Sequence, residues 1–417
     1  MGKKISSIDI DINKIRDACK ILSKSSIRKI DLLKSNTFSG ISGNNVYLKL
    51  ECFQKTGSFK VRGATTMLYN LPEDLKKNGV IAASAGNHAQ GVAFASRMNN
   101  VDCTIVMPRN ASPAKISATK SYGAKVILDG ANYDEAYDLT KKIAERENKT
   151  IIPAFNHPDI IAGQGTIGLE ILEDLDQIDE VHVPVGGGGL ISGVALALKA
   201  VKPKIKVIGV QSKAFPAISE SIRENRIVKV QRGHTIADGI SVKLPGELTF
   251  EIIKEYVDDI VLVDDLSIVK TMFLLMERSK VVAEPAGAIS LAYLLRDMSM
   301  KANEERHKGK NIVSIISGGN VDMYLLGQVV AKGLMQTGRM VKLFVELTDK
   351  PGALKGIVDE ITNANVNIVE VVHDRLSSNI PAGTAGVYLS LELENKDQAK
   401  LLVSLLRKQK INFKIVN

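Results

Sequence analysis

The chain has 417 residues, with 45% hydrophobic and 24% charged side chains and a formal net charge of +9. This length predicts two or three domains, and the composition is globular rather than disordered or membrane-embedded. The positive charge is spread over helix faces where lysines alternate with acids, and no aromatic residues interleave with a basic stripe. We therefore expect neither nucleic-acid nor membrane partners.

The N-terminal residues and the cysteines indicate the cellular compartment. Met1-Gly2-Lys3-Lys4-Ile5 lacks the apolar core of a secretory signal, and no apolar run is long enough to span a membrane. Cys19, Cys52 and Cys103 cannot all pair, and their spacing is not that of a metal site. The sequence predicts a cytoplasmic protein with reduced thiols.

Most of the chain alternates short apolar strands with amphipathic helices. The strands are predicted at 46–50, 80–83, 102–107, 125–128, 150–153, 180–184, 206–210 and 311–316. The helices are predicted at 87–98, 112–122, 134–148, 164–175 and 190–201. This alternation is typical of parallel sheets covered by helices on both faces, where ligands bind beyond the C-terminal strand ends. A polar segment at 300–310 predicts an exposed loop before the last strand.

The pattern changes after a boundary near 336–338. Strands are predicted at 340–347, 367–372, 383–393 and 413–416, with helices at 353–364 and 396–408. This βαββαβ order is typical of an α+β ferredoxin-like module. The sequence therefore predicts a separate second domain over 340–417.

The stretch Ser58-Phe59-Lys60-Val61-Arg62-Gly63 places a lysine at a corner between an apolar strand and a helix. Such a lysine is partly desolvated, which lowers its pKa and lets it form a Schiff base with an aldehyde and later act as a base. Most lysines are only surface charges, and Lys55 is a nearby competitor, but it lies in a polar run. Lys60 is the candidate nucleophile and base.

Four consecutive glycines, Gly186, Gly187, Gly188 and Gly189, follow a predicted strand and open a helix. Glycine lets backbone amides approach an anion closely, and the helix dipole favours a phosphate there. The spacing matches neither a nucleotide P-loop nor a dinucleotide fingerprint. A phosphate site is the functional interpretation, and a flexible turn is the alternative.

Two other loops follow predicted strands. Ser84-Ala85-Gly86-Asn87-His88 starts a helix, where it either binds a carboxylate or supplies Ser84 or Asn87 as a helix cap. Ser317-Gly318-Gly319-Asn320 follows the last strand and offers a hydroxyl to a heteroaromatic nitrogen. Taken alone, neither loop identifies a function.

These four motifs, together with Glu284-Pro285-Ala286-Gly287-Ala288, resemble those of the fold-type II pyridoxal-phosphate enzymes over about residues 5–330. The closest resemblance is to the threonine and serine ammonia-lyases, with serine racemase as near kin. It implies an α/β, two-lobed body with parallel sheets. The catalytic domain would span 1–335, with a small lobe at about 61–155 inserted in the large lobe.

The resemblance also implies a role for each loop. Lys60 would hold pyridoxal 5′-phosphate as a Schiff base, with Phe59 packed beside the ring. The other cofactor contacts would be the phosphate at Gly186, Gly187, Gly188 and Gly189, the ring hydroxyl at Asn87, the pyridine nitrogen at Ser317 and the pocket wall at Glu284. The substrate carboxylate would be bound by the loop Ser84, Ala85, Gly86, Asn87 and His88.

The implied reaction converts L-threonine to 2-oxobutanoate and ammonia, with L-serine as a slower substrate. Lys60 would remove the α-proton, and a neutral Ser317 would favour prompt loss of the β-hydroxyl. Serine racemase or serine ammonia-lyase is the alternative, because Ser84 could supply an acid on the opposite face of Cα. Gln211 occupies the position of an acid in some relatives' cation site, so no metal is expected. A non-catalytic sensor would need a damaged lysine or glycine loop, and both are intact.

The C-terminal segment 340–417 resembles an ACT regulatory domain through the turn Asp349-Lys350-Pro351-Gly352-Ala353-Leu354. Such modules bind small amino acids where two modules meet. The resemblance implies allosteric control by an amino acid or nucleotide in a homo-oligomer, a tetramer or dimer. The implied effector residues are Asp349, Pro351, Gly352, Ala353 and Leu354. A purely structural role in assembly is the alternative.

Overall fold

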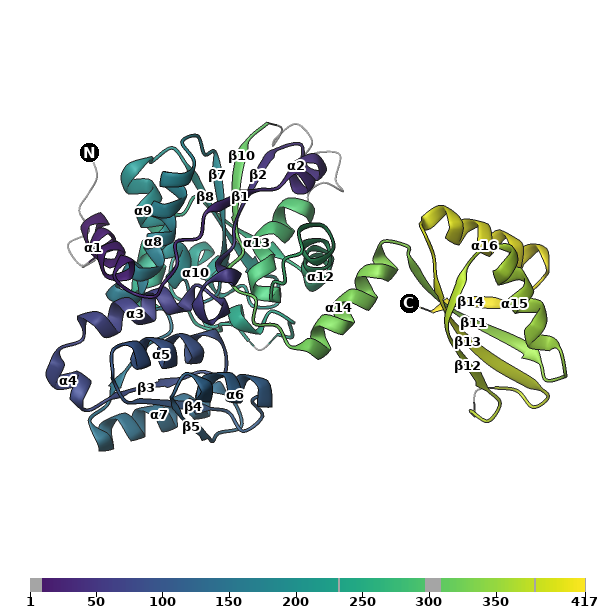
Figure 1. Ribbon diagram of the computed structural model, residues 1–417, viewed down its shortest axis with the longest axis horizontal. Coiled ribbons are helices and arrows are strands. Elements are labelled where there is room, and N and C mark those ends of the chain that lie inside the picture. Colours follow the sequence, from purple (N-terminus) through teal and green to yellow (C-terminus); the bar gives the residue numbers. More distant parts are fainter. Residues whose placement is uncertain (1–9, 232, 297–308, 379, 417) are drawn as a thin grey trace. The chain divides into compact units, whose positions relative to one another are not determined.

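The protein is described by a computed structural model that covers residues 10–231, 233–296, 309–378 and 380–416. It forms two compact units, Met1–Asp322 and Met323–Asn417 (Figure 1). The helix α14 (Met323–Gln336) groups with the second unit, whereas the predicted boundary lies after this helix. The N-terminal residues 1–9 and most of the predicted loop at 300–310 lie outside the described residues.

A six-stranded sheet forms the centre of the first unit. Its order is β1-β2-β10-β7-β8-β9, and all neighbours are parallel except β1 and β2. The strands are β1 (Leu32–Lys34), β2 (Asn45–Lys49), β7 (Glu180–Val185), β8 (Lys206–Ser212), β9 (Asp259–Val263) and β10 (Asn311–Ile315).

Helices pack around this sheet, because this arrangement buries their apolar residues against the apolar residues of the strands (Figure 1). The helix α9 is apolar nearly all round, and ten of its residues are buried between the sheet and neighbouring helices. The helices of this part are α1 (Ile12–Ser23), α2 (Asn36–Ser42), α8 (Pro158–Asp174), α9 (Gly189–Val201), α10 (Ala217–Arg223), α11 (Glu247–Tyr256), α12 (Asp265–Leu274) and α13 (Pro285–Arg296).

A second, four-stranded sheet in the same unit is parallel throughout, with the order β5-β4-β3-β6. Its strands are β3 (Val80–Ala83), β4 (Cys103–Met107), β5 (Lys125–Leu128) and β6 (Thr150–Ile151). Alternate residues of β3 face opposite sides: Ala82 packs in the cluster that contains α5, and Ile81 in the one that contains α7. The helices of this part are α3 (Lys60–Asn70), α4 (Glu73–Lys77), α5 (Asn87–Met98), α6 (Pro113–Ser121) and α7 (Tyr133–Glu147).

The second unit carries an antiparallel sheet of order β12-β13-β11-β14. Its elements after α14 are β11 (Met340–Thr348), α15 (Ala353–Asn363), β12 (Asn367–Asp374), β13 (Thr384–Glu392), α16 (Lys396–Lys408) and β14 (Phe413–Val416). One face of the sheet and the two helices enclose an apolar core that includes Val345, Ile361 and Leu406. The predicted ferredoxin-like fold is confirmed.

The predicted α/β architecture with parallel sheets is also confirmed, although some boundaries were wrong. The strand β6 ends at Ile151 rather than at residue 153. The helix α8 begins at Pro158 rather than at Gln164, because His157 caps it and proline is well suited to the first helical position. Among the described residues, no helix is both long enough and apolar enough to cross a membrane.

Candidate active site

A cavity of about 500 Å³ lies in the first unit, beyond the C-terminal ends of β3, β7 and β10. This is where loops gather in parallel sheets. All the residues that the sequence assigned to the cofactor or the substrate line it: Phe59, Lys60, Ser84, Ala85, Gly86, Asn87, His88, Gly186, Gly187, Gly188, Gly189, Glu284 and Ser317. The fold thus brings together motifs that lie far apart in the sequence.

Lys60 is the first residue of α3 and reaches into this cavity. Its Nζ donates a hydrogen bond to the carbonyl of Ala154 at 3.2 Å and lies 5.4 Å from the centre of the Phe59 ring. Desolvation of the amine lowers the pKa of Lys60 to about 8, against the opposing effect of the Glu284 carboxylate. A larger neutral fraction makes this amine a better nucleophile and base than an ordinary surface lysine.

The backbone before Lys60 is attached to the loop that carries Ser317. The amide of Phe59 donates to the Ser317 carbonyl at 3.1 Å, and the amide of Gly319 donates to the Gly57 carbonyl at 2.9 Å. These bonds fix the segment before Lys60 relative to the loop that carries Ser317.

The glycine loop connects β7 to α9, and Gly188 is the N-cap of the helix with a φ of 96°. A β-carbon at Gly188 would lie 2.8 Å from Thr249 and from Ile253. One at Gly187 would overlap the ring of Phe155. The hydroxyl of Thr249 also donates to the Gly187 carbonyl at 2.7 Å. The loop is therefore closely packed from behind, and the predicted alternative of a flexible turn does not describe it.

The loop from Ser84 to His88 precedes and begins α5. The N-cap is Gly86, and no side chain caps the helix, so the alternative of a Ser84 or Asn87 cap is wrong. Instead, the Ser84 hydroxyl accepts a hydrogen bond from the Gly86 amide at 3.2 Å. The first turn of α5 carries no acid, which leaves the positive end of the helix dipole available to an anion.

The side chain of His88 does not take part in an anion site. Its Nε2 lies 2.9 Å from the Ile152 carbonyl, and burial lowers the pKa of this imidazole to about 4. The ring is thus neutral and bonded to Ile152. Any contribution of His88 to carboxylate binding comes from its backbone.

A chain of polar side chains crosses the cavity wall from Asn320 to Glu284. Asn320 Nδ2 donates to Asn87 Oδ1 at 2.7 Å, and Asn87 Nδ2 donates to Glu284 Oε1 at 2.6 Å. Burial, helped by the negative charge of Asp238, raises the pKa of Glu284 to about 7. Glu284 can therefore hold or release a proton near neutral pH.

Ser317 is 3% exposed and donates a long hydrogen bond of 3.4 Å to the Ala286 carbonyl. It presents a neutral hydroxyl to the cavity. A neutral group at this place cannot form an ion pair with a protonated ring nitrogen.

Several cavity residues carried no signal in the sequence. Ala154 and Phe155 follow β6, and they touch the Lys60 amine and the glycine loop respectively. At the cavity mouth, Lys115 pairs with Asp238 at 2.8 Å, and a second pair joins Asp134 and Lys243 at 3.1 Å. These contacts depend on how distant segments pack, so no local pattern could reveal them.

The residues present fit pyridoxal 5′-phosphate. A desolvated amine can take its aldehyde, and a packed loop of four glycines at the start of α9 can take its phosphate. The hydroxyl of Ser317 and the amide of Asn87 can take the ring's polar atoms. The cavity of about 500 Å³ has room for this cofactor and a small amino acid.

Two other predicted features involve residues that do not line this cavity. Gln211 is fully buried, and its Oε1 accepts a hydrogen bond from the Ser219 amide at 3.1 Å. In the part of the chain that the structure describes, no group of three or more His, Cys, Asp or Glu could hold a metal ion. Of the predicted effector residues, Asp349, Pro351 and Gly352 lie in the turn between β11 and α15, and Ala353 and Leu354 begin α15. Asp349 pairs with Arg375 at 3.1 Å.

Comparison with known proteins agrees with this geometry. Residues 24–318 match the family model described as "Pyridoxal-phosphate dependent enzyme". An L-threonine ammonia-lyase of Thermotoga maritima is 44% identical over 383 residues, which are 92% of this chain and 94% of the relative.

Two solved structures resemble the chain to the same degree. The processed form of threonine deaminase isoform 2 from Solanum lycopersicum has a TM-score of 0.72 and 36% identity, covering 77% of this chain and 94% of that chain. Maize serine racemase also has a TM-score of 0.72 and 36% identity, covering 78% and 98%. The protein described here belongs to the family of pyridoxal-phosphate dependent enzymes.

Proposed function

We propose that this chain is an L-threonine ammonia-lyase that converts L-threonine to 2-oxobutanoate and ammonia, and L-serine more slowly to its 2-oxoacid. The observation that carries the proposal is the desolvated Lys60 amine, which shares one cavity with the glycine loop. The Thermotoga relative, whose similarity extends over 92% of this chain, supports the choice of substrate. The reaction balances because the water lost across Cα–Cβ is regained on hydrolysis.

When bound, pyridoxal phosphate supplies an aldehyde for the substrate amine and an electron sink for the charge that develops at Cα. Lys60 then removes the α-proton at Nζ, because its low pKa keeps a usable fraction of the amine neutral near neutral pH. The backbone amides at the start of α5, after Ser84, bind and orient the substrate carboxylate. The glycine loop holds the phosphate through amides at the start of α9.

The polar chain on the cavity wall orients the remaining groups. Asn320 fixes the amide of Asn87, so that its nitrogen faces Glu284 and the cavity. Glu284 holds a proton near neutral pH, and Ser317 offers only a neutral hydroxyl. Because Ser317 is neutral, it would not stabilise a positive charge on the nitrogen of a bound cofactor ring. The site would therefore favour prompt loss of the substrate's β-hydroxyl over return of the proton to Cα.

Release of 2-oxoacid by the purified protein with added cofactor tests this activity. We expect faster release from L-threonine than from L-serine, and none from either in a Lys60→Ala variant. The maize serine racemase similarity makes racemisation the second candidate, with Ser84 as the acid on the other face of Cα. Chiral chromatography of L-serine reactions distinguishes the two candidate functions. Formation of D-serine without 2-oxoacid would contradict the lyase and support the racemase.

We propose in addition that the second unit is an ACT regulatory domain, and that two or more copies of the chain associate through it. The turn at Asp349, Pro351, Gly352, Ala353 and Leu354 is the proposed effector site, for an amino acid or a nucleotide. Isoleucine and valine, added to the threonine assay, are the first ligands to try. Light scattering over a range of protein concentrations tests association, and a monomer throughout would contradict it. A cytoplasmic location stays a prediction.

A further inference from the structure

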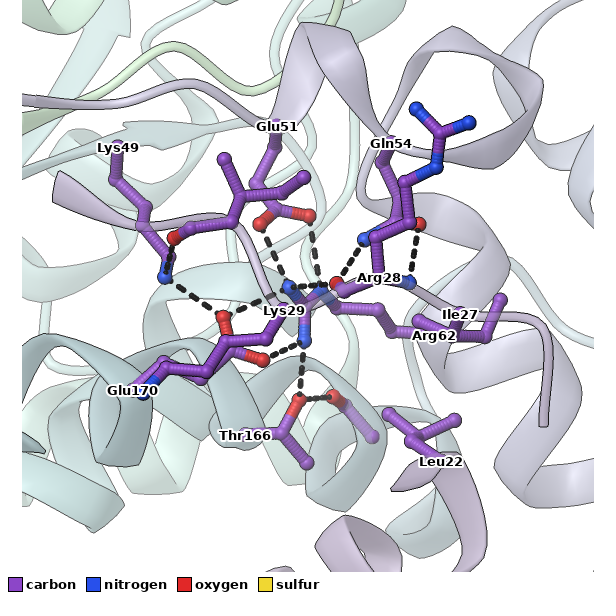
Figure 2. A network of polar contacts seen from close by, with 12 residues as sticks. Leu22, Ile27, Arg28, Lys29, Lys49, Glu51, Gln54, Arg62, Thr166 and Glu170 are labelled. Atoms are coloured by element: carbon purple, nitrogen blue, oxygen red, sulfur yellow. Dashed lines mark hydrogen bonds and ion pairs between the residues drawn. The ribbon is translucent and has the colours of Figure 1, made fainter. Parts of the chain in front are cut away.

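A buried network of charged side chains is built on the first turn of α3, and its charged members do not line the cavity. Its centre is Arg62, which is two residues after Lys60 on α3 and only 1% exposed (Figure 2). Nε and Nη2 of Arg62 each donate to a Glu51 oxygen at 2.8 Å. Nη1 and Nη2 donate to the two oxygens of Glu170 at 2.6 and 2.9 Å. The guanidinium is therefore held by two carboxylates at once.

Three more residues belong to the network: Thr166, Arg28 and Lys49. Arg62 donates to the Thr166 hydroxyl at 3.1 Å and to the Arg28 carbonyl at 3.2 Å. Lys49, which is fully buried, binds Glu170 at 2.7 Å. Two cations and two carboxylates thus balance one another, and each of the three guanidinium nitrogens of Arg62 donates at least one hydrogen bond (Figure 2).

Stability alone is a weak reason for such a network. A buried ion pair loses about as much by desolvation as it gains by attraction, and well-packed apolar residues often do as well or better. A planar guanidinium has several donors in fixed directions. It therefore gives a defined orientation to the helix that carries the arginine.

The first turn of α3 needs such an orienting contact. It is backed by α5 at Gly91, where a β-carbon would lie 3.1 Å from the Val61 amide nitrogen, and it crosses α8 where Gly63 meets Gly163. Glycine contacts set how close two helices come, but they provide no side chains that interlock and stop one helix from rotating or sliding. Arg62 lies in this same turn and is bound to α8 through Glu170 and to the 3-10 helix Glu51–Phe53 through Glu51.

We propose that Arg62 is a positioning residue, which fixes the first turn of α3 through Glu51 and Glu170 and so holds the Lys60 amine in the cavity. This inference rests on the proposed role of Lys60 as the cofactor-binding lysine. Without the fork, α3 keeps its contacts at the glycines, the buried side chain of Val61 and the backbone bond from Phe59 to Ser317. It loses the side-chain ties to Glu51 and Glu170 that set its rotation, so Lys60 no longer has one defined place beside the Ala154 carbonyl.

The test measures capture of pyridoxal phosphate by the cofactor-free full-length protein, as absorbance against time over a range of pH. The main variant is Glu51→Met/Arg62→Met, which removes one positive and one negative charge and leaves the Lys49–Glu170 pair balanced. Arg62→Lys keeps the charge but loses the fork. Lys49→Met is the matched control, because it breaks a bond to Glu170 and leaves every bond of Arg62 in place. Thermal unfolding of each cofactor-free protein is recorded alongside.

We expect the double variant to unfold close to the wild-type temperature but to capture the cofactor about tenfold more slowly or worse at neutral pH. The pH midpoint of capture should be higher than that of the wild type, because a displaced amine is better solvated and its pKa is lowered less. Arg62→Lys should behave in the same way, and Lys49→Met should capture as the wild type does. Glu284 and His88 are titratable groups that interact with Lys60, and burial keeps His88 neutral by lowering its pKa to about 4. A Glu284→Gln background identifies the contribution of the carboxylate to the pH profile.

Wild-type capture by the double variant would overturn the inference, as would equal loss of capture in Lys49→Met and Arg62→Lys. If the double variant does not fold, the same measurement on Arg62→Lys tests the inference, and capture at the wild-type rate would overturn it. Failure of the proposed function looks different, because Lys60→Ala would then capture the cofactor as well as the wild type does.

Discussion

Two glycines in this chain share one backbone conformation but have different surroundings. Gly188 caps α9 with φ 96° and ψ −9°, and Gly352 caps α15 with φ 87° and ψ −10°. A β-carbon at Gly188 would press on Thr249 and Ile253, whereas one at Gly352 would meet nothing within 4 Å. The same local turn is closed in by packing in the first unit and open in the second.

The difference teaches how a glycine turn becomes a binding site. Both turns expose amides at the start of a helix, which is enough to attract an anion weakly. Only the first is packed from behind, by Phe155 and Thr249, and faces a cavity that also holds Lys60. A packed loop keeps its amides in one arrangement, and such pre-organisation favours tight binding of a phosphate.

Among the variants that test this comparison, Lys60→Ala should have the largest effect, because it removes the amine that shares the cavity with the packed turn. We expect 2-oxoacid release from L-threonine to fall at least about a thousandfold, because nucleophile and base are lost together. The unfolding temperature without cofactor should not fall, since the change removes a desolvated amine. Residual turnover near the wild-type rate would contradict the assignment.

Gly188→Ala should have the next largest effect. A left-handed backbone costs a residue with a β-carbon about 1–2 kcal/mol, and overpacking against Thr249 and Ile253 adds about 1–3 kcal/mol. We expect cofactor affinity, measured by absorbance titration, to fall more than tenfold. Phe155→Leu, which leaves the backbone of the loop unchanged, is the control for general loosening of the wall. An unchanged affinity in Gly188→Ala would show that the packing is not needed.

Glu284→Gln should change how stability depends on pH. Burial raises the pKa of Glu284 from 4.5 to about 7, so between these values the folded protein binds more protons than the unfolded chain. The free energy of unfolding of cofactor-free protein should therefore fall as pH rises through this window, by up to about 3 kcal/mol. Denaturant titrations at several pH values should show this fall in the wild type and a smaller one in Glu284→Gln. Equal slopes would contradict the raised pKa.

Gly352→Ala should have the smallest effect. Only the strain of the positive φ applies, since no neighbour is close, so we expect a loss of about 1–2 kcal/mol in the stability of the second unit. Calorimetry of the full chain measures this, with Gly356→Ala, an open position inside α15, as the control. A loss clearly above about 2 kcal/mol would show that neighbours also press on this turn, and it would remove the contrast between the two turns.

Local patterns in the sequence were sufficient for the elements and loops with strong periodicity or unusual composition. The helix Asn87–Met98 and the strand Val80–Ala83 were predicted to the residue, because turn residues such as Gly79, Gly86 and Asn100 flank them. The strand β9 (Asp259–Val263) was not predicted, although its apolar run 260–263 is typical of a strand. The resemblance of the motifs supplied the cavity residues, which periodicity alone could not have joined.

Long-range packing could not be predicted. That Asn87 is held between Asn320 and Glu284 depends on three segments meeting in space, and so does the place of Phe155 behind the glycine loop. Arg62 was part of a recognised motif, yet its partner Glu170 lies on another helix and gave no signal. Each of these contacts follows from the fold, which must be known first.

The central claim, that this cavity holds pyridoxal phosphate on Lys60, is tested most directly by locating the modified lysine. Borohydride reduction of the loaded protein fixes the cofactor to the amine that holds it, and mass spectrometry of the peptides identifies the residue. We predict the added mass on the peptide that contains Lys60 and on no other. The same mass on Lys55, or on Lys115 at the cavity mouth, would contradict the claim.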